Sequence, residues 1–175
     1  MFKHSAIVIA ALLAAIPATH TAAAYPERPI RMIVPFAPGG GSDISARTMS
    51  DELGQALGTT IVVDNRPGAG STLGADIASK ASPDGYTLFL GNISMAFNAA
   101  LFKKLPFNAL RDFAPISLAT EQPNIIVIHP SLPAKNFQEF IALARQQPGK
   151  LNYGSAGLGS GTHLAMEMLM MSQKI

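Results

Sequence analysis

Two glycine-rich turns hold the residues of this chain that are best placed to do chemistry. They are residues 35–43 (PFAPGGGSD) and 154–163 (GSAGLGSGTH). Each follows a short β-branched or aromatic run and precedes a stretch with helical periodicity. A helix N-terminus exposes unpaired N–H groups and about half a positive charge, and glycine lets a ligand approach bare backbone. The sequence therefore predicts two anion-binding turns.

The first turn fits neither common phosphate motif. No Gly-Lys-Ser/Thr follows it, and the G-x-G-x-x-G spacing fails. It can be a tight turn alone, with Ser42 or Asp43 as the N-cap. Three successive glycines at the carboxyl end of a parallel strand nevertheless favour ligand contact. Arg47 lies four residues after Asp43 and is expected to form a surface or capping ion pair with it.

The second turn contains no G-x-S-x-G nucleophile elbow. A hydrolase could use Ser155 or Ser160 as nucleophile with His163 as base, but no orienting carboxylate is evident nearby. The ordinary interpretation makes Ser160 or Thr162 the N-cap of a helix that carries His163 in its first turn. The sequence favours this second interpretation and predicts no enzyme.

Other residues outside the two turns give weaker indications of a functional site. Asn65 and Asn92 each follow a strand and either present an amide to a pocket or occupy a turn. The chain has no Cys, which excludes disulfides and thiolate metal sites, and its four histidines are too few and too scattered for a metal site. We expect no metal and no cofactor. The Met-rich stretch 166–171 is expected to pack a core or a lobe interface.

These turns must be positioned by alternating strands and helices. The pattern favours an α/β fold with parallel βαβ units. Between Leu105 and Pro133, prolines become frequent and predict a crossover into a second lobe. The predicted strands are Ile30–Pro35, Ile61–Asn65, Tyr86–Leu90 and Leu151–Ser155, and the predicted helices are Asp43–Leu57, Ser71–Lys80, a short one within Gly91–Ala100, and Asn136–Gln147.

The N-terminus has the three regions of a secretory signal peptide. Lys3 and His4 form a basic region, residues 6–16 are apolar, and residues 22–24 supply small residues, which predicts cleavage after Ala24 and a periplasmic protein. The remaining chain is nearly neutral, because only Lys3 is lost from 13 Lys and Arg that face 11 Asp and Glu. A basic stripe is absent, which argues against nucleic acid and membrane-surface partners.

Several motifs together resemble one family, the Bug-type periplasmic solute receptors of tripartite tricarboxylate transporters. The resemblance runs from Tyr25 to the end of the chain. It implies a two-lobed Venus-flytrap fold, with residues 25–120 in lobe one and 121–175 at the start of lobe two. The motifs are YPERPIRMIVPFAPGGGSDISAR (25–47), VDNRPGAGSTLGA (63–75), SPDGYTLFLG (82–91) and LNYGSAGLGSGTHLAMEM (151–168).

The resemblance also implies a ligand, a partner and a site. The ligand would be a small carboxylate, such as a di- or tricarboxylate, an acidic amino acid or an aromatic acid, and the partners would be membrane subunits of the transporter. Family members continue well past residue 175, so the fold is expected to be incomplete, and a non-functional truncated receptor is an alternative. The implied ligand-binding residues are Phe36, Pro38, Gly39, Gly40, Gly41, Ser42, Asp43, Asn92, Ser94, Asn98, Gly157, Gly159, Ser160, Thr162 and His163.

Overall fold

A parallel three-stranded sheet forms the centre of the protein. The computed structural model describes residues 24–175, so the predicted leader lies outside it except for Ala24. The strands β1 (Ile30–Val34), β2 (Ile61–Asn65) and β3 (Thr87–Phe89) lie in the order β2-β1-β3. Ile30 pairs with Ile61, and Arg31 pairs with Thr87. The predicted parallel α/β class is confirmed.

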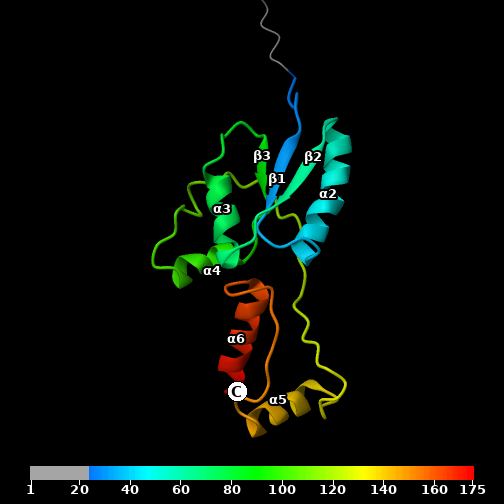
Figure 1. The fold of residues 1–175 in the computed structure, drawn as a ribbon, viewed down its shortest axis with the longest axis vertical. Helices are drawn as coiled ribbons and strands as arrows, with labels where there is room; N and C mark the ends of the chain where they lie inside the picture. The colour runs from blue at the N-terminus through cyan, green and yellow to red at the C-terminus, as the bar shows by residue number, and fades with distance from the viewer. Residues whose placement is uncertain (1–23) are drawn as a thin grey trace, which may run out of the picture.

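Helices flank this sheet on two sides (Figure 1). Helix α2 (Gly41–Leu57) packs against β2 and β1, whereas the 3-10 turn η2 (Ala69–Ser71) leads into α3 (Thr72–Ser79), which packs against β3 and β1. Helix α4 (Ser94–Leu101) follows β3. We call residues 24–112, which contain these elements, the sheet part.

The core of the sheet part is built around β1. Ile30, Ile33 and Val34 are fully buried, and Met32 is nearly so. Helices cover both faces of this middle strand, so all its residues except the partly exposed Arg31 are buried, which explains why β1 lacks the alternating pattern of a half-exposed strand. Ala46 of α2 and Ile61 of β2 complete the cluster.

Gly74 lets α3 approach the end of β1, and this contact gives a first prediction. A Cβ at Gly74 would lie 2.8 Å from Pro35 Cβ and 3.1 Å from Arg66 O. We expect Gly74→Ala to lower the free energy of unfolding by about 1–3 kcal/mol because the added methyl overpacks this contact. Urea denaturation measures the loss. Gly154→Ala is the control, since a Cβ there meets nothing within 4 Å, and equal stability of the two variants would contradict the packing argument.

The rest of the chain forms a helical part, residues 130–175. It contains α5 (Phe137–Gln146) and α6 (Gly161–Gln173), which lie beyond the carboxyl ends of the strands (Figure 1). Helix α5 is capped by Asn136, whose Oδ1 accepts from Glu139 N at 2.9 Å, and Glu139 Oε2 accepts from Lys135 N, just before the cap, at 2.7 Å. Arg145 donates to the carbonyl of Gln173 and so joins the two helices.

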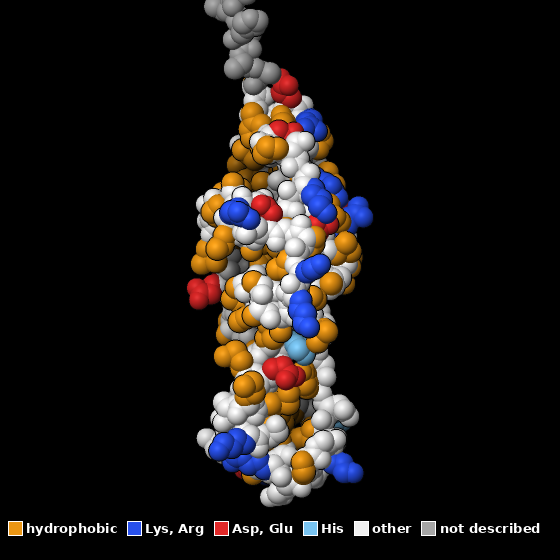
Figure 2. All heavy atoms as spheres, turned by 90° about the vertical axis from the view of Figure 1, so that its left-hand side faces the viewer, with side chains coloured by type: hydrophobic (Ala, Val, Ile, Leu, Met, Phe, Trp, Pro, Cys, Tyr) orange, Lys and Arg blue, Asp and Glu red, His pale blue; other side chains and the backbone are white. Residues whose placement is uncertain are grey.

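Two expectations about the helical part are wrong. Leu151–Ser155 is not a strand, and no described residue pairs with it as a strand would require. The Met-rich stretch does not pack a core, since α6 has no buried residue and Met168 and Met171 are mostly exposed, and its alternative role at a lobe interface stays a prediction. Hydrophobic side chains lie on the surface of both parts of the molecule (Figure 2). Within residues 24–175, no helix combines the length and apolarity needed to cross a bilayer.

Candidate functional site

The N-termini of two helices, α2 and α6, both lie at the boundary between the sheet part and the helical part. The parallel strands all end toward this boundary, where α2 begins, and α6 begins at the same boundary from the opposite side (Figure 1). Helix α2 starts at Gly41 and α6 at Gly161. Both helices therefore direct the positive ends of their dipoles toward the boundary.

The first glycine turn is held in place by the buried carboxylate of Asp43. Its Oδ2 accepts from Gly39 N at 2.9 Å and from Arg47 Nε at 3.0 Å, and its Oδ1 accepts from Asn65 Nδ2 at 2.9 Å. Asp43 is only 3% exposed. The hydrogen bond from Arg47, followed by those from Gly39 and Asn65, lowers the pKa of Asp43 to about 2. The Asp43 carboxylate thus forms its hydrogen bonds with the turn and with the residues that hold it.

Asn65, the last residue of β2, ties the same turn to the sheet. Its Nδ2 also donates to the carbonyl of Phe36 at 3.0 Å, and its Oδ1 accepts from Arg47 Nη2 at 3.1 Å. The amide of Asn65 therefore bonds to the first glycine turn and not to a pocket, and Asn65 lies within β2 and not in a turn. The expected pairing of Asp43 with Arg47 is present, with 3.0 Å between Arg47 Nη2 and Asp43 Oδ1. The roles of Asn65 and Arg47 in holding the turn were not predicted.

The buried carboxylate of Asp43 predicts a pH dependence of stability. A pKa lowered in the folded state stabilises the fold above the usual carboxyl pKa, and this contribution is lost as the pH falls toward 2. We expect the free energy of unfolding to decrease from pH 5 to pH 2 and Asp43→Asn to remove part of that slope. Asp51→Asn, on the exposed side of α2, is the matched control. Identical slopes for Asp43→Asn and wild type in urea titrations would contradict the prediction.

The first turn leaves backbone donors free for an anion. The first hydrogen bond of the helical type runs from Ile44 N to Gly40 O at 3.0 Å. The N–H groups of Gly41, Ser42 and Asp43 precede it and have no acceptor within the helix. Residues 38–41 are exposed, and a Cβ at Gly39 would meet nothing within 4 Å. A Cβ at Gly41 would lie 3.6 Å from Gln122 Nε2, so the approach is open on the Gly39 side and is bordered by the Gln122 side chain at Gly41.

The second glycine turn makes more hydrogen bonds among its own residues than the first. Ser160 caps α6, with its Oγ accepting from His163 N at 3.2 Å, and Ala156 N donates to Thr162 Oγ1 at 3.1 Å. Gly157 N donates to Ser155 Oγ at 3.3 Å. These bonds confirm Ser160 as the N-cap and leave the first N–H groups of α6, after Ser160, as the free donors of this turn.

His163 is not arranged as the base of a serine nucleophile. Its Nδ1 accepts from Gly159 N at 3.5 Å, and its Nε2 lies 3.7 Å from Glu167 Oε1, a carboxylate that sequence inspection overlooked. Tyr153 donates its hydroxyl proton to the same Glu167 oxygen at 2.7 Å, and this hydrogen bond raises the pKa of Tyr153. Ser160 Oγ bonds Thr162 Oγ1 and His163 N rather than the imidazole.

The two parts touch through glycines of the second turn. A Cβ on Gly70 of η2 would lie 2.9 Å from Leu158 O and 3.3 Å from Gly159 Cα, and a Cβ on Gly161 would lie 2.8 Å from Ile93 Cγ2. Gly70 and Ile93 were not predicted to belong to the site. The sequence shows a glycine-rich turn, RPGAG (66–70), at the end of β2. It does not show which segment this turn contacts.

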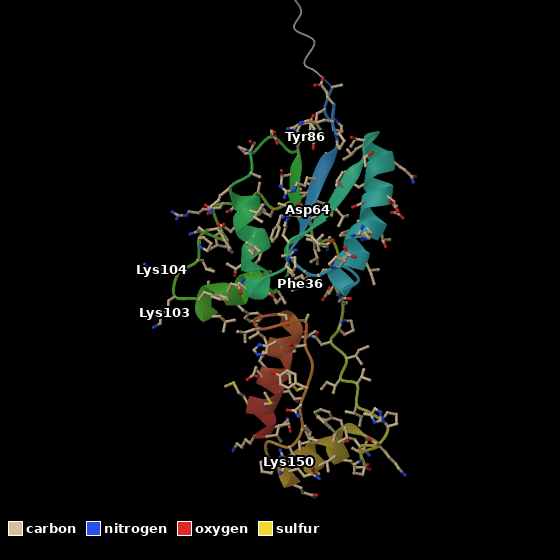
Figure 3. The ribbon with its side chains drawn as sticks, in the orientation of Figure 1. Phe36, Asp64, Tyr86, Lys103, Lys104 and Lys150 are labelled. Atoms are coloured by element: carbon tan, nitrogen blue, oxygen red, sulfur yellow. The ribbon has the colours of Figure 1, made fainter. Side chains whose placement is uncertain are left out.

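The remaining predicted site residues belong to the start of α4. Asn92 Oδ1 accepts from Ser94 N at 2.9 Å just before this helix, whose N-cap is Ile93. Ser94 and Asn98 are fully buried. Phe36 lies at the boundary, whereas Lys150 lies at the far end of the helical part (Figure 3). Among residues 24–175, no group of three His, Asp or Glu side chains is arranged to hold a metal ion.

Comparison with known families identifies the chain over most of its length. Residues 45–175 match the family described as the tripartite tricarboxylate transporter family receptor. A relative from Bordetella pertussis, the protein BugT, is 38% identical over 160 residues, which are 90% of this chain and 49% of that protein. The chain thus spans about half the length of the curated relatives it matches.

Solved structures with the same fold support this assignment. Rpa4515 of R. palustris, solved with adipate, superimposes with a TM-score of 0.82 at 31% identity, covering 86% of this chain and 51% of that protein. MatC of Rhodopseudomonas palustris, solved with malate, gives a TM-score of 0.80 at 35% identity and covers 86% and 52%. The chain therefore shares the fold of these proteins over about half of their length.

Proposed function

Because the chain belongs to the tripartite tricarboxylate transporter receptor family, we propose that it binds a small carboxylate for delivery to the membrane subunits of such a transporter. This is a receptor family and not an enzyme family. The absence of a hydrogen bond between any serine hydroxyl and the His163 imidazole in the described residues agrees with a binding role.

The meeting of two glycine-lined helix N-termini at one boundary is the observation that carries the proposal. Free N–H groups at Gly41 and Ser42, with the dipole of the 17-residue helix α2 behind them, offer a carboxylate hydrogen bonds and a favourable potential. Helix α6 adds the same features from the other side. Asp43 does not oppose the anion at full strength because Arg47 pairs with it.

The ligand class follows from the donors and from the relatives. Backbone N–H groups recognise a carboxylate without selecting the rest of the molecule, so several acids can share this cradle. The relatives solved with malate and with adipate both hold dicarboxylates. We propose that the ligand of this chain is an organic acid of similar size, held by the predicted residues of the two turns.

A thermal-shift screen tests the proposal directly. Purified protein is heated with malate, succinate, adipate, citrate and glutamate, and with glycerol as an uncharged control. A ligand present at 100 times its Kd should stabilise the fold by roughly 2.7 kcal/mol, which is a shift of several degrees for a protein of this size. Calorimetric titration then confirms stoichiometric binding. No shift and no heat with any acid would refute the proposal.

We also propose that the protein acts in the periplasm. We expect the leader to direct export to the periplasm, where a receptor meets its transporter. Mass spectrometry of periplasmic extract should find Tyr25 as the N-terminal residue. Intact Met1 on protein recovered from the cytoplasm would contradict this expectation.

A further inference from the structure

We propose that Ser94 and Asn98 form a subsite for a hydroxyl group, so that the preferred ligand is a hydroxy acid and not the unsubstituted acid. This inference rests on the proposed function, because it concerns the second functional group of the carboxylate that the glycine turns hold. It adds a chemical distinction that the backbone donors themselves cannot make.

Both side chains present polar atoms that the protein leaves without a partner. Ser94 and Asn98 are 0% exposed, and among the described residues neither Ser94 Oγ nor Asn98 Oδ1 has a hydrogen-bond partner. They are four residues apart on α4 and therefore lie on the same face of this helix. An unpaired buried polar atom is costly, so one that persists calls for a partner from outside the described residues.

The amide of Asn98 has only one possible orientation. Its Nδ2 donates to the carbonyl of Gly70 at 3.0 Å and to Thr72 Oγ1 at 3.1 Å. Because the Gly70 carbonyl can only accept, exchanging the amide nitrogen and oxygen would destroy that bond. The unpaired atom is therefore an acceptor, and its missing partner must be a hydrogen-bond donor.

No described residue supplies a hydrogen-bond donor to Asn98 Oδ1. Asn98 Oδ1 faces the second glycine turn, since it lies 3.8 Å from the position of a Cβ on Gly159. Gly159 carries no side chain, and its N–H is directed to His163 Nδ1. A partner for Asn98 Oδ1 must therefore lie between the second glycine turn and α4, and the short distance there favours a small group attached to the ligand.

A hydroxyl satisfies both orphan atoms better than a second carboxylate or an ammonium. It donates to Asn98 Oδ1 and can accept from Ser94 Oγ, whereas a carboxylate offers acceptors only. An ammonium would bring a charge to two neutral, fully buried partners, which is unfavourable without a counter-ion. The geometry therefore favours a hydroxyl over both.

Three acids that differ in one substituent test this subsite by calorimetry. Malate, succinate and aspartate carry a hydroxyl, a hydrogen and an ammonium at the same carbon. We expect malate to bind about tenfold more tightly than succinate, the equivalent of one or two neutral hydrogen bonds. In Ser94→Ala the ratio of malate affinity to succinate affinity should fall, and Ser117→Ala, on an exposed segment, should leave this ratio unchanged.

The outcomes separate this inference from the proposed function. Equal affinity for malate and succinate would overturn the hydroxyl subsite and leave the carboxylate receptor standing. Tighter binding of aspartate than of malate would also overturn it, as would an unchanged malate preference in Ser94→Ala. If none of these acids and none in the thermal-shift screen binds, the proposed function fails as well. Should Ser94→Ala fail to fold, the comparison of the three acids on the wild-type protein still decides.

Discussion

Gly40→Val should reduce carboxylate affinity by at least about a hundredfold, roughly 3 kcal/mol, while the protein stays folded. Gly40 is the N-cap of α2 and has an extended backbone with φ of −78°, which valine adopts without strain. A Cβ there would lie 3.5 Å from Ala37 O, an ordinary contact. The isopropyl group would instead occupy the open approach to the N–H groups of the first turn. Calorimetry with whichever acid binds the wild type measures the loss.

Two further variants make this result interpretable. Ser42→Ala removes one hydroxyl from the same turn and should cost at most about 1 kcal/mol of binding, the contribution of a neutral hydrogen bond. Ala119→Val adds an apolar group to an exposed segment far along the chain and should leave affinity unchanged. Undiminished binding by Gly40→Val, with a circular dichroism spectrum like that of the wild type, would remove the first glycine turn from the site.

The sheet part could be predicted because its strands are encoded locally. The apolar run of β1 lacks alternation because helices cover both sides of it, and the glycines after Pro38 mark where α2 begins. The predicted ends of β2, Ile61 and Asn65, agree with the structure, and the other boundaries differ by one or two residues. The short helix expected within residues 91–100 begins at Ser94 and ends at Leu101, one residue beyond that range.

The failures come from interactions between distant segments. Leu151–Ser155 carries only Leu151 and Tyr153 as strand-favouring residues, and a strand also needs a neighbour with which to exchange hydrogen bonds, which the described residues do not supply there. The role of Asn65 in the site depends on β2 ending beside the first turn, 29 residues away from Phe36. The sequence spacing of these residues contains no sign of that contact.

The unpaired polar atoms of α4 are a second feature that the sequence alone could not predict. Ser94 and Asn98 were implied as ligand-binding residues by family resemblance alone. Their chemistry became specific only when the bond from Asn98 to the Gly70 carbonyl identified which amide atom is left unpaired. The hydrogen-bond partners of a side-chain amide determine where its nitrogen and its oxygen lie, and these partners are known only from the tertiary structure.

The segment 113–129, between the sheet part and the helical part, should be the first to be cut by a protease. It contains no helix, strand or turn, and its residues 113–128 make no backbone-to-backbone hydrogen bond with any other described residue. Opening it for cleavage therefore requires little free energy, whereas β1 opens only when the sheet unfolds. We expect proteinase K to cut here at least about a hundredfold faster than within residues 30–90, since a difference of roughly 3 kcal/mol in opening corresponds to that ratio. First cuts within α2 or β2 would contradict this expectation.

The same segment should make the protein associate with itself. Ile125 and Val127 are 80% and 85% exposed, and in an extended chain residues two apart project to the same side. An unpaired apolar edge of this kind is a template for pairing with another chain. The double variant Ile125→Lys, Val127→Lys should therefore shift sedimentation toward the monomer without changing the free energy of unfolding, while Ser131→Lys should not. Association of the double variant equal to that of the wild type would exclude the segment as the contact surface and would point instead to the exposed Met168 and Met171 of α6.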